Sequence, residues 1–444
     1  MRTFFPALLV AFGFAAAAPC ADAQTYRAER PYRGLFAQGG QQDLEQSLSV
    51  SGSAGAGFDK NLAAGLVRPG SAPSDLNSNV RSGVAQASGS INYRLDLSAF
   101  TLNASGSTAL HYYPSMNSHV LRHNYADVGA TAQVTRDVTV NGSMEYAPYG
   151  LSSLFPFTSP GLPDGGVNPS VDLTSSLEHY LTFGGGAGYL HHVSKRAAFF
   201  ADYLMEVRGQ TTFSQPYRRQ RVGGGYTYDL AKGMALRAGY HFDDADYGLT
   251  NRRFHYHQID AGIDYNRALS FSRRTTLTFH TGSAAVSNTD NPVTQFQYTL
   301  TGGARLNHEF GRTWNADVAY ERGVNVDPTW ANLVRSDSAS ASVMGMINRR
   351  LNFSATARAA TGNVGGTSTG NNDFETYYGD ASLNYALGRH INVGTNYVYY
   401  RHRFDQGVVI PIDFANTYNR HAIRAYVSVW APLVQRARRT HAAR

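Results

Sequence analysis

Hydrophobic and polar residues alternate with a period of two along most of this chain. In the stretch 234–243, Met, Leu, Ala, Tyr and Phe alternate mostly with Arg, Gly, His and Asp, and the stretch 314–321 repeats the pattern. Such alternation is typical of a strand with one apolar and one polar face. The runs extend over roughly 10 to 14 residues, whereas strands of soluble sheets are commonly about 5–6 residues long. The pattern therefore predicts long strands that stand between lipid and a water-filled interior.

Short turns alternate with longer segments that are rich in Asn, Asp, Pro and Gly. The short turns are expected near Leu95–Ala99, Thr135–Asp137, Ser194–Arg196, Ala231–Gly233, Ser270–Arg274, Gly311–Thr313, Asn348–Arg350 and Gly388–His390. The longer segments are 58–79, 114–120, 149–176, 211–216, 244–253, 287–294, 325–335, 363–372 and 405–417. This order predicts an all-β fold, an antiparallel transmembrane up-and-down β-barrel of about 18 strands, with 16 strands as the alternative. The short turns are expected to face the periplasm and the longer segments the exterior.

Aromatic residues mark the expected membrane boundaries. Those beside the short turns are Tyr228, Tyr265, Phe310, Trp314 and Tyr385, and those further along the strands are Phe242, Tyr397 and Tyr399. Barrels carry aromatic girdles at both interfaces of the membrane. The last strand is expected at 419–430, and a basic tail follows it.

The first 23 residues have the features of a secretory signal peptide. Arg2 precedes an almost unbroken apolar run, Phe4–Ala18, and a small-residue cleavage site precedes Gln24. A membrane anchor is disfavoured because a spanning helix needs about 20 apolar residues, and a lipidated Cys20 is disfavoured by Pro19 beside it. The expected organisation is a signal peptide (1–23), a periplasmic N-terminal segment (24–44), an outer-membrane β-barrel (45–430) and a basic C-terminal tail (431–444).

Composition and charge narrow the class of protein further. The single cysteine lies within the signal peptide, so neither disulfides nor thiolate metal sites are expected in the mature chain. The mean hydropathy of −0.33 is compatible with a barrel, whose alternation hides its apolar band. The formal net charge is +7, of which four positive charges lie in residues 431–444. The barrel itself is therefore close to neutral, and nucleic acid is not an expected partner.

No arrangement of side chains in the sequence points to an enzyme, a cofactor or a metal ion. His255 and His257 are two residues apart, but alternation points both outward and no third ligand follows at close spacing. The glycine runs 184–186 and 223–225 lie within strands, whereas phosphate-binding loops join a strand to a helix. The Ser, His and acidic residues used by barrel proteases and phospholipases have no matching set here. We therefore expect no catalytic activity.

The opening strand carries a family resemblance. It reads Ser-Leu-Ser-Val-Ser-Gly from Ser47 and Gly-Ala-Gly-Phe-Asp-Lys-Asn from Gly55. This ending, an aromatic residue followed by Asp-x-Asn, resembles the first strand of the exopolysaccharide-associated barrels of the beta-barrel porin 2 family. Hairpins with Tyr and Leu beside a tight turn, as at 225–233 and 382–390, extend the resemblance over most of 45–430. The resemblance implies an outer-membrane pore that works with polysaccharide synthesis and export machinery, and it implies no catalytic residues.

The polar face of the strands supplies the candidate pore lining. Alternation places nine acidic side chains and six arginines in the lumen, an excess of three negative charges that is small for a charge-selective pore. The main candidates are Glu145, Asp202, Glu206, Arg221, Arg237, Asp260, Asp264, Arg305, Asp317, Glu321, Asp380 and Arg424. These charges are expected to be solvated or paired across neighbouring strands, or to line a path for a polar, weakly charged solute such as a glycan. Inward glycines are expected to allow curvature or the close approach of another segment.

The segment 149–176 is the longest of the expected exterior loops and contains four prolines. Prolines reduce the entropy lost when a segment is fixed, so Phe155, Phe157 and Asp164 are candidates for a constriction inside the lumen. An ordinary surface loop is the alternative.

The predicted function is an outer-membrane pore for passive passage of polar solutes or for export of a polysaccharide. Its expected partners are outer-membrane lipid, a polar solute or glycan, and periplasmic export machinery. The alternative is a closed structural or adhesin-like barrel that acts through its exterior loops.

Overall fold

The computed structural model describes the strands and most of their short connections. The described residues are 44–60, 81–114, 119–148, 179–209, 216–248, 252–269, 272–288, 297–327, 332–364, 372–408 and 416–437. The predicted signal peptide, residues 24–43 and the constriction candidates Phe155, Phe157 and Asp164 lie outside these ranges. Within the described ranges, no helix is long and apolar enough to cross a membrane.

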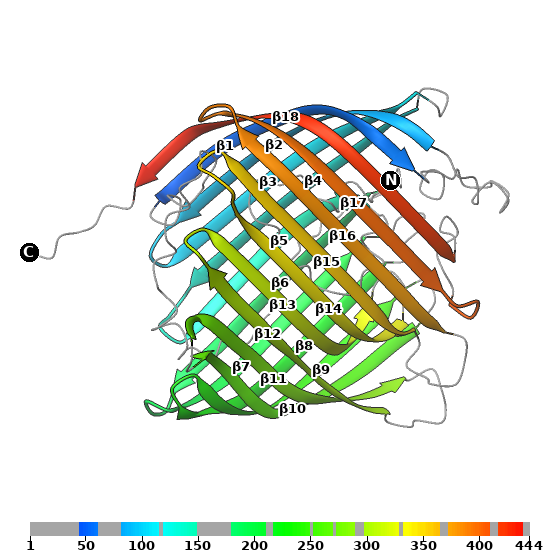
Figure 1. Cartoon of the computed structure of the whole chain (residues 1–444). Coiled ribbons are helices and arrows are strands. Elements are labelled where there is room, and N and C mark those ends of the chain that lie inside the picture. Colours follow the sequence, from blue (N-terminus) through cyan, green and yellow to red (C-terminus); the bar gives the residue numbers. More distant parts are fainter. Residues whose placement is uncertain are drawn as a thin grey trace, which may run out of the picture.

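The described residues form one antiparallel sheet of 18 strands that closes on itself. The strands are β1 (Leu44–Lys60), β2 (Arg81–Asp96), β3 (Phe100–Tyr113), β4 (His119–Gln133), β5 (Val138–Pro148), β6 (His179–His192), β7 (Ala197–Arg208), β8 (Tyr217–Ala231), β9 (Met234–Tyr247), β10 (Arg252–Leu269), β11 (Ser272–Asn288), β12 (Gln297–Phe310), β13 (Trp314–Asp327), β14 (Asn332–Met346), β15 (Leu351–Val364), β16 (Asp373–Ala386), β17 (Ile391–Phe404) and β18 (Thr417–Ala437). Each strand pairs with its sequence neighbours, and β1 also pairs with β18, so the closed sheet has no open edge. Figure 1 shows the tilted strands, with β1 and β18 side by side at the top of the view. The predicted 18-stranded up-and-down barrel is confirmed.

The short turns gather at one end of the barrel. Two of them depend on glycines in the left-handed region, Gly233 with φ of 74° and Gly311 with φ of 67°. In another short turn, the Asn348 side-chain oxygen accepts hydrogen bonds from the backbone N–H groups of Arg350 and Leu351, at 2.8 and 2.9 Å. Outer-membrane barrels have short periplasmic turns and longer extracellular connections. The end with the long connections, on the right in Figure 1, is therefore the exterior end.

The strand register sorts the side chains of each strand onto two faces. Val318 of β13 lies opposite Leu306 of β12 and Ala341 of β14. Leu306 and Val318 are 39% and 53% exposed, which is the environment of side chains that contact lipid. The alternate residue Asp317 is buried and faces the lumen. Followed from strand to strand through the register, this alternation assigns each described residue to the outer or the inner face.

Several strands extend further than the sequence pattern predicts. β18 continues past Trp430 to Ala437, where it pairs with Leu44, so residues 431–437 belong to the barrel and not to a tail. The segments 244–253 and 325–335, expected as exterior loops, are mostly strand as well. Polar composition explains the difference, because a strand that rises above the membrane meets water on both faces. It then loses its alternation but keeps its backbone pairing.

Candidate functional site: the lumen wall

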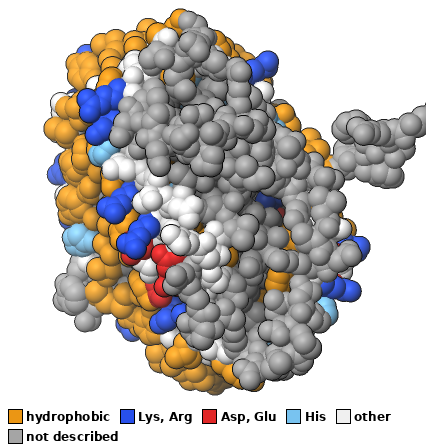
Figure 2. All heavy atoms as spheres, turned by 90° about the vertical axis from the view of Figure 1, so that its right-hand side faces the viewer, with side chains coloured by type: hydrophobic (Ala, Val, Ile, Leu, Met, Phe, Trp, Pro, Cys, Tyr) orange, Lys and Arg blue, Asp and Glu red, His pale blue; other side chains and the backbone are white. Residues whose placement is uncertain are grey.

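Large apolar side chains cover the outer face of the barrel. Tyr298 and Leu300 of β12 are each 76% exposed, and girdle residues such as Tyr228 and Tyr397 also point outward. Figure 2 looks onto the exterior end, where hydrophobic side chains form most of the visible outer wall. A closed barrel pairs all its backbone groups internally, so it can present this surface to a bilayer. The protein is an outer-membrane barrel, and its candidate functional site is the inner wall of the lumen.

The predicted pore-lining residues lie at inward positions of the register. Glu145, Glu206 and Asp380 lie opposite Asp127, Arg219 and Thr356 of neighbouring strands. Only the backbone of Asp260 is described, and it pairs with Gly239 of β9. Of the other eight predicted residues, six form ion pairs between arginine and carboxylate groups, and Asp202 and Glu321 each contact a histidine.

Two of these ion pairs join two predicted residues on adjacent strands. Arg237 of β9 donates to both oxygens of the Asp264 carboxylate on β10, at 2.6 and 2.7 Å. Arg305 of β12 donates to Asp317 of β13 at 2.6 Å. Hydrogen bonds between guanidinium and carboxylate groups are stronger than bonds between neutral groups. Each pair therefore cancels its own charge within the wall.

Two contacts between a histidine and a carboxylate span three strands by crossing over a glycine. His241 Nε2 of β9 lies 3.1 Å from Asp202 Oδ1 of β7, and Gly223 of β8 lies between them in the register. A Cβ atom on Gly223 would stand 2.0 Å from the His241 ring. In the same way His280 Nε2 of β11 lies 3.4 Å from Glu321 Oε1 of β13 across Gly303 of β12. These inward glycines thus make room for side chains that lie along the wall.

A buried charge cluster closes the seam between β1 and β18. Arg420 Nε donates to Asp59 Oδ1 at 2.9 Å, Arg420 Nη2 donates to Asp59 Oδ2, and Arg424 Nη2 donates to the same Oδ2 at 3.3 Å. Asp59 is fully buried and Arg424 is 2% exposed. Alternation predicts Arg424 in the lumen but not Asp59, which falls in the segment 58–79 expected to be a loop. The inward serines earlier in β1 share the parity of Asp59 and are the signal that could have identified it.

A second buried cluster lies about half-way round the barrel from the seam, on β8 and β9. Asp243 accepts hydrogen bonds from Arg219 Nε at 2.6 Å and from Arg221 Nε at 2.8 Å. The Asp243 side chain is 1% exposed, whereas that of Arg221 is 27% exposed. Asp243 shares the inward parity of Arg237 and lies within the alternating stretch 234–243, so alternation identifies its face, although it was not among the candidate lining residues. In both clusters one carboxylate pairs with two arginines, so each cluster keeps a net charge of +1.

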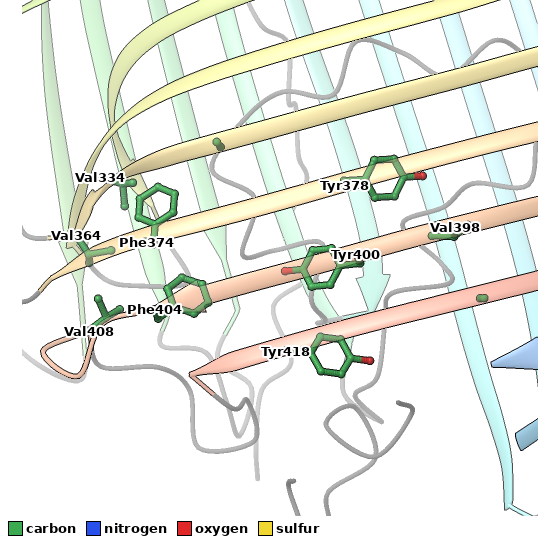
Figure 3. Packing of buried hydrophobic residues seen from close by; sticks show 11 residues of the cluster. Val334, Val364, Phe374, Tyr378, Val398, Tyr400, Phe404, Val408 and Tyr418 are labelled. Carbon is green, nitrogen blue, oxygen red and sulfur yellow. The ribbon is translucent and has the colours of Figure 1, made fainter. Parts of the chain in front are cut away.

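Part of the inner wall is aromatic. The side chains of Phe374, Tyr378, Tyr400, Phe404 and Tyr418 pack together with valines of β14–β17, as Figure 3 shows. The ring centroids of Tyr400 and Tyr418 are 5.9 Å apart, and those of Phe374 and Phe404 are 6.2 Å apart. Tyr400 is fully buried. We call these five residues the aromatic wall; it lies on the exterior half of β16–β18.

Small hydroxyl side chains line another part of the lumen. Ser336, Ser338, Ser340 and Ser342 occupy successive inward positions of β14, and Ser51 of β1 contacts Ser90 of β2 at 2.6 Å. Each hydroxyl can both donate and accept a hydrogen bond. Within the described ranges, no group of His, Cys, Asp and Glu side chains is arranged to hold a metal ion. The wall therefore offers a path of neutral polar groups and mutually paired charges.

Comparison with known proteins gives a likeness in structure only. No family model matches the chain, and no curated protein matches it. Pseudomonas aeruginosa OpdO covers 89% of this chain and 100% of its own, at 12% identity and a TM-score of 0.41. Pseudomonas aeruginosa OccK2 (OpdF), solved in complex with glucuronate, covers 88% and 99% at 11% identity and a TM-score of 0.43. Acinetobacter baumannii OccAB3 covers 88% and 100% at 11% identity and a TM-score of 0.41. At these values the likeness assigns neither a family nor a solute to this chain.

Proposed function

We propose that this barrel is an outer-membrane pore for the passive passage of polar, weakly charged solutes. Barrels of 16 to 18 strands are too wide for side chains to fill, so they leave an aqueous channel. The observation that carries the proposal is the pairing of the inner-wall charges, as in Arg237–Asp264 and Arg305–Asp317. Paired charges project little net field into the lumen, and the single positive charge left in each buried cluster is small for so wide a channel, so selectivity rests mainly on size and hydrogen bonding.

We further propose a carbohydrate as the solute, including export of a polysaccharide with periplasmic export machinery. Two features support this finer proposal. The serines of β14 and the seam strands offer neutral donors and acceptors that match sugar hydroxyls. The opening-strand resemblance to exopolysaccharide-associated barrels points in the same direction.

One observation favours the alternative of a closed structural or adhesin-like barrel. Several inward side chains on the exterior half are almost completely buried, among them Tyr113, Tyr247 and Tyr400. Side chains that line an open channel would retain contact with water. A barrel closed at this level would act through its exterior loops and not through its lumen.

Single-channel recording in planar bilayers separates the two functions. The pore predicts stable conductance with weak preference between cations and anions, and neutral sugars should enter proteoliposomes. Asp264→Asn leaves the charge of Arg237 uncompensated in the wall, so the reversal potential should shift toward anions. Asp337→Asn is the matched control, because Asp337 lies on the outer face opposite Arg322. A folded barrel without conductance at any voltage would contradict the pore and support the closed barrel.

A further inference from the structure

The outer face of the seam carries basic side chains at its exterior end. Lys60 of β1 lies opposite His421 of β18 on one side and Arg81 of β2 on the other. Arg401 and Arg403 follow on the outward face of β17. We call these five residues the seam rim. They form one continuous group because β17, β18, β1 and β2 are successive neighbours in the closed sheet.

The seam rim borders directly on the lipid-facing band. Phe58 lies two positions before Lys60 along β1, on the side of the membrane centre. It lies opposite Ile423 of β18, which in turn lies opposite Tyr397 of β17. These three side chains are 45%, 56% and 41% exposed. Two residues along a strand correspond to about 7 Å. The basic groups therefore stand where the acyl chains of the outer leaflet end and the headgroups begin.

Two outward arginines elsewhere at the exterior end already have carboxylate partners. Arg253 donates to both oxygens of Asp244 at 2.7 Å, and Arg322 lies 3.5 Å from Asp337. By contrast, the described residues provide no carboxylate within salt-bridge distance of Lys60, Arg81, Arg401 or Arg403. At the exterior end, the outward positions described for β17, β18, β1 and β2 carry no acidic residue; the nearest are Glu375, directly opposite Arg403 on β16, and Asp405, two residues after Arg403.

A phosphate group supplies the charge that this surface lacks. Guanidinium groups bind phosphate oxygens with two parallel hydrogen bonds, and a lysine adds a point charge. His421 is held in place by Tyr397, whose hydroxyl lies 2.8 Å from Nδ1, and by the Tyr399 ring at 4.9 Å. A lipid whose acyl chains lie against Phe58 and Ile423 would bring its headgroup phosphate to these cations.

We propose that the seam rim is a binding site for the phosphate groups of an anionic outer-leaflet glycolipid. This site is independent of conduction through the lumen, since every residue in it faces away from the lumen. A bound lipid would hold the outer surface of β1 and β18 together from outside, on the strand pair that the Asp59 cluster holds from inside.

The test compares lipid retention by the full barrel in detergent, measured by native mass spectrometry. The probes are lipid A with two phosphates and the same lipid after enzymatic removal of both phosphates. The barrel should retain the phosphorylated form preferentially. Removing two cations with R401Q/R403Q should reduce retention about tenfold or more, because each basic residue near an anionic surface adds to the attraction. R253Q/R322Q, which removes two outward arginines that already have carboxylate partners, should change retention little.

Two outcomes would overturn the proposal. Equal retention of the phosphorylated and dephosphorylated lipid by the unmodified barrel would show that phosphate is not recognised, and this arm needs no variant. Equal loss of retention in R401Q/R403Q and R253Q/R322Q would show a general effect of charge without a site. K60Q/R81Q provides an independent variant on β1 and β2, and it should reproduce the loss. Retention unchanged in both seam-rim variants would also refute the site.

Discussion

Removing the carboxylate of the seam cluster should destabilise the barrel strongly, because it leaves two buried arginines without their partner. In Asp59→Asn, Arg420 and Arg424 keep their charges but lose the carboxylate that binds both of them. Because Asp59 is fully buried and the Arg420 side chain is 8% exposed, water cannot replace the lost partner. Removing one partner of a buried pair costs about 3–5 kcal/mol. We expect Asp59→Asn to lower the free energy of unfolding by about that amount.

The assay is reversible unfolding by urea in lipid vesicles, followed by tryptophan fluorescence. Asp244→Asn is the matched control, since it removes a carboxylate from Arg253, whose side chain is 59% exposed. Exposed pairs contribute about 1 kcal/mol or less. Replacing Asp59, Arg420 and Arg424 together by apolar residues of similar size should be less harmful than Asp59→Asn, because no unpaired charge remains. Equal losses in Asp59→Asn and Asp244→Asn would refute the reasoning.

Three further predictions follow from the sequence and the faces of the strands. The mature chain should begin at Gln24, and mass spectrometry of outer-membrane fractions checks this; an intact N-terminus or a lipid on Cys20 would contradict it. Val318→Arg should cost about 2–4 kcal/mol in the same unfolding assay if Val318 lies near mid-membrane, and the inward Asn315→Arg should cost far less; equal costs would mean that the faces are misassigned. Deleting residues 158–170 should raise single-channel conductance if this segment constricts the lumen, and unchanged conductance in a folded deletion variant would refute that role.

The strands and their faces were predictable because the membrane imposes a period of two wherever one face meets lipid. That constraint ends above the bilayer, and there the predictions fail. Asp59 lies at the exterior end of β1 and residues 244–247 at that of β9, where the polar sequence resembles a loop although the backbone is still paired. At the opposite end of the barrel, residues 431–437 were expected as a tail but form the end of β18.

The pairing partners were less predictable than the faces. Arg420 and Asp59 are 361 residues apart, and nothing near either residue in the sequence indicates the other. Their contact requires the first and last strands to meet in one particular register. Arg237 and Asp264 were both predicted to face inward, but their pairing likewise depends on the register of β9 and β10. Alternation specifies on which face of the sheet a side chain lies. Its pairing partner is specified only by the strand register of the closed barrel.

Gly223 and Gly303 contribute no side chain to the lumen, yet they affect how wide it can be. The His241 side chain extends over Gly223 and the Glu321 side chain over Gly303, so both lie along the wall of the barrel and do not point toward its axis. A Cβ atom on Gly303 would stand 2.1 Å from Glu321 Oε2 and 2.9 Å from the His280 ring, so both side chains would have to turn toward the barrel axis. The free cross-section is thus set partly by residues that no solute would recognise. A change from glycine to alanine could narrow the lumen without adding any bulky group to it.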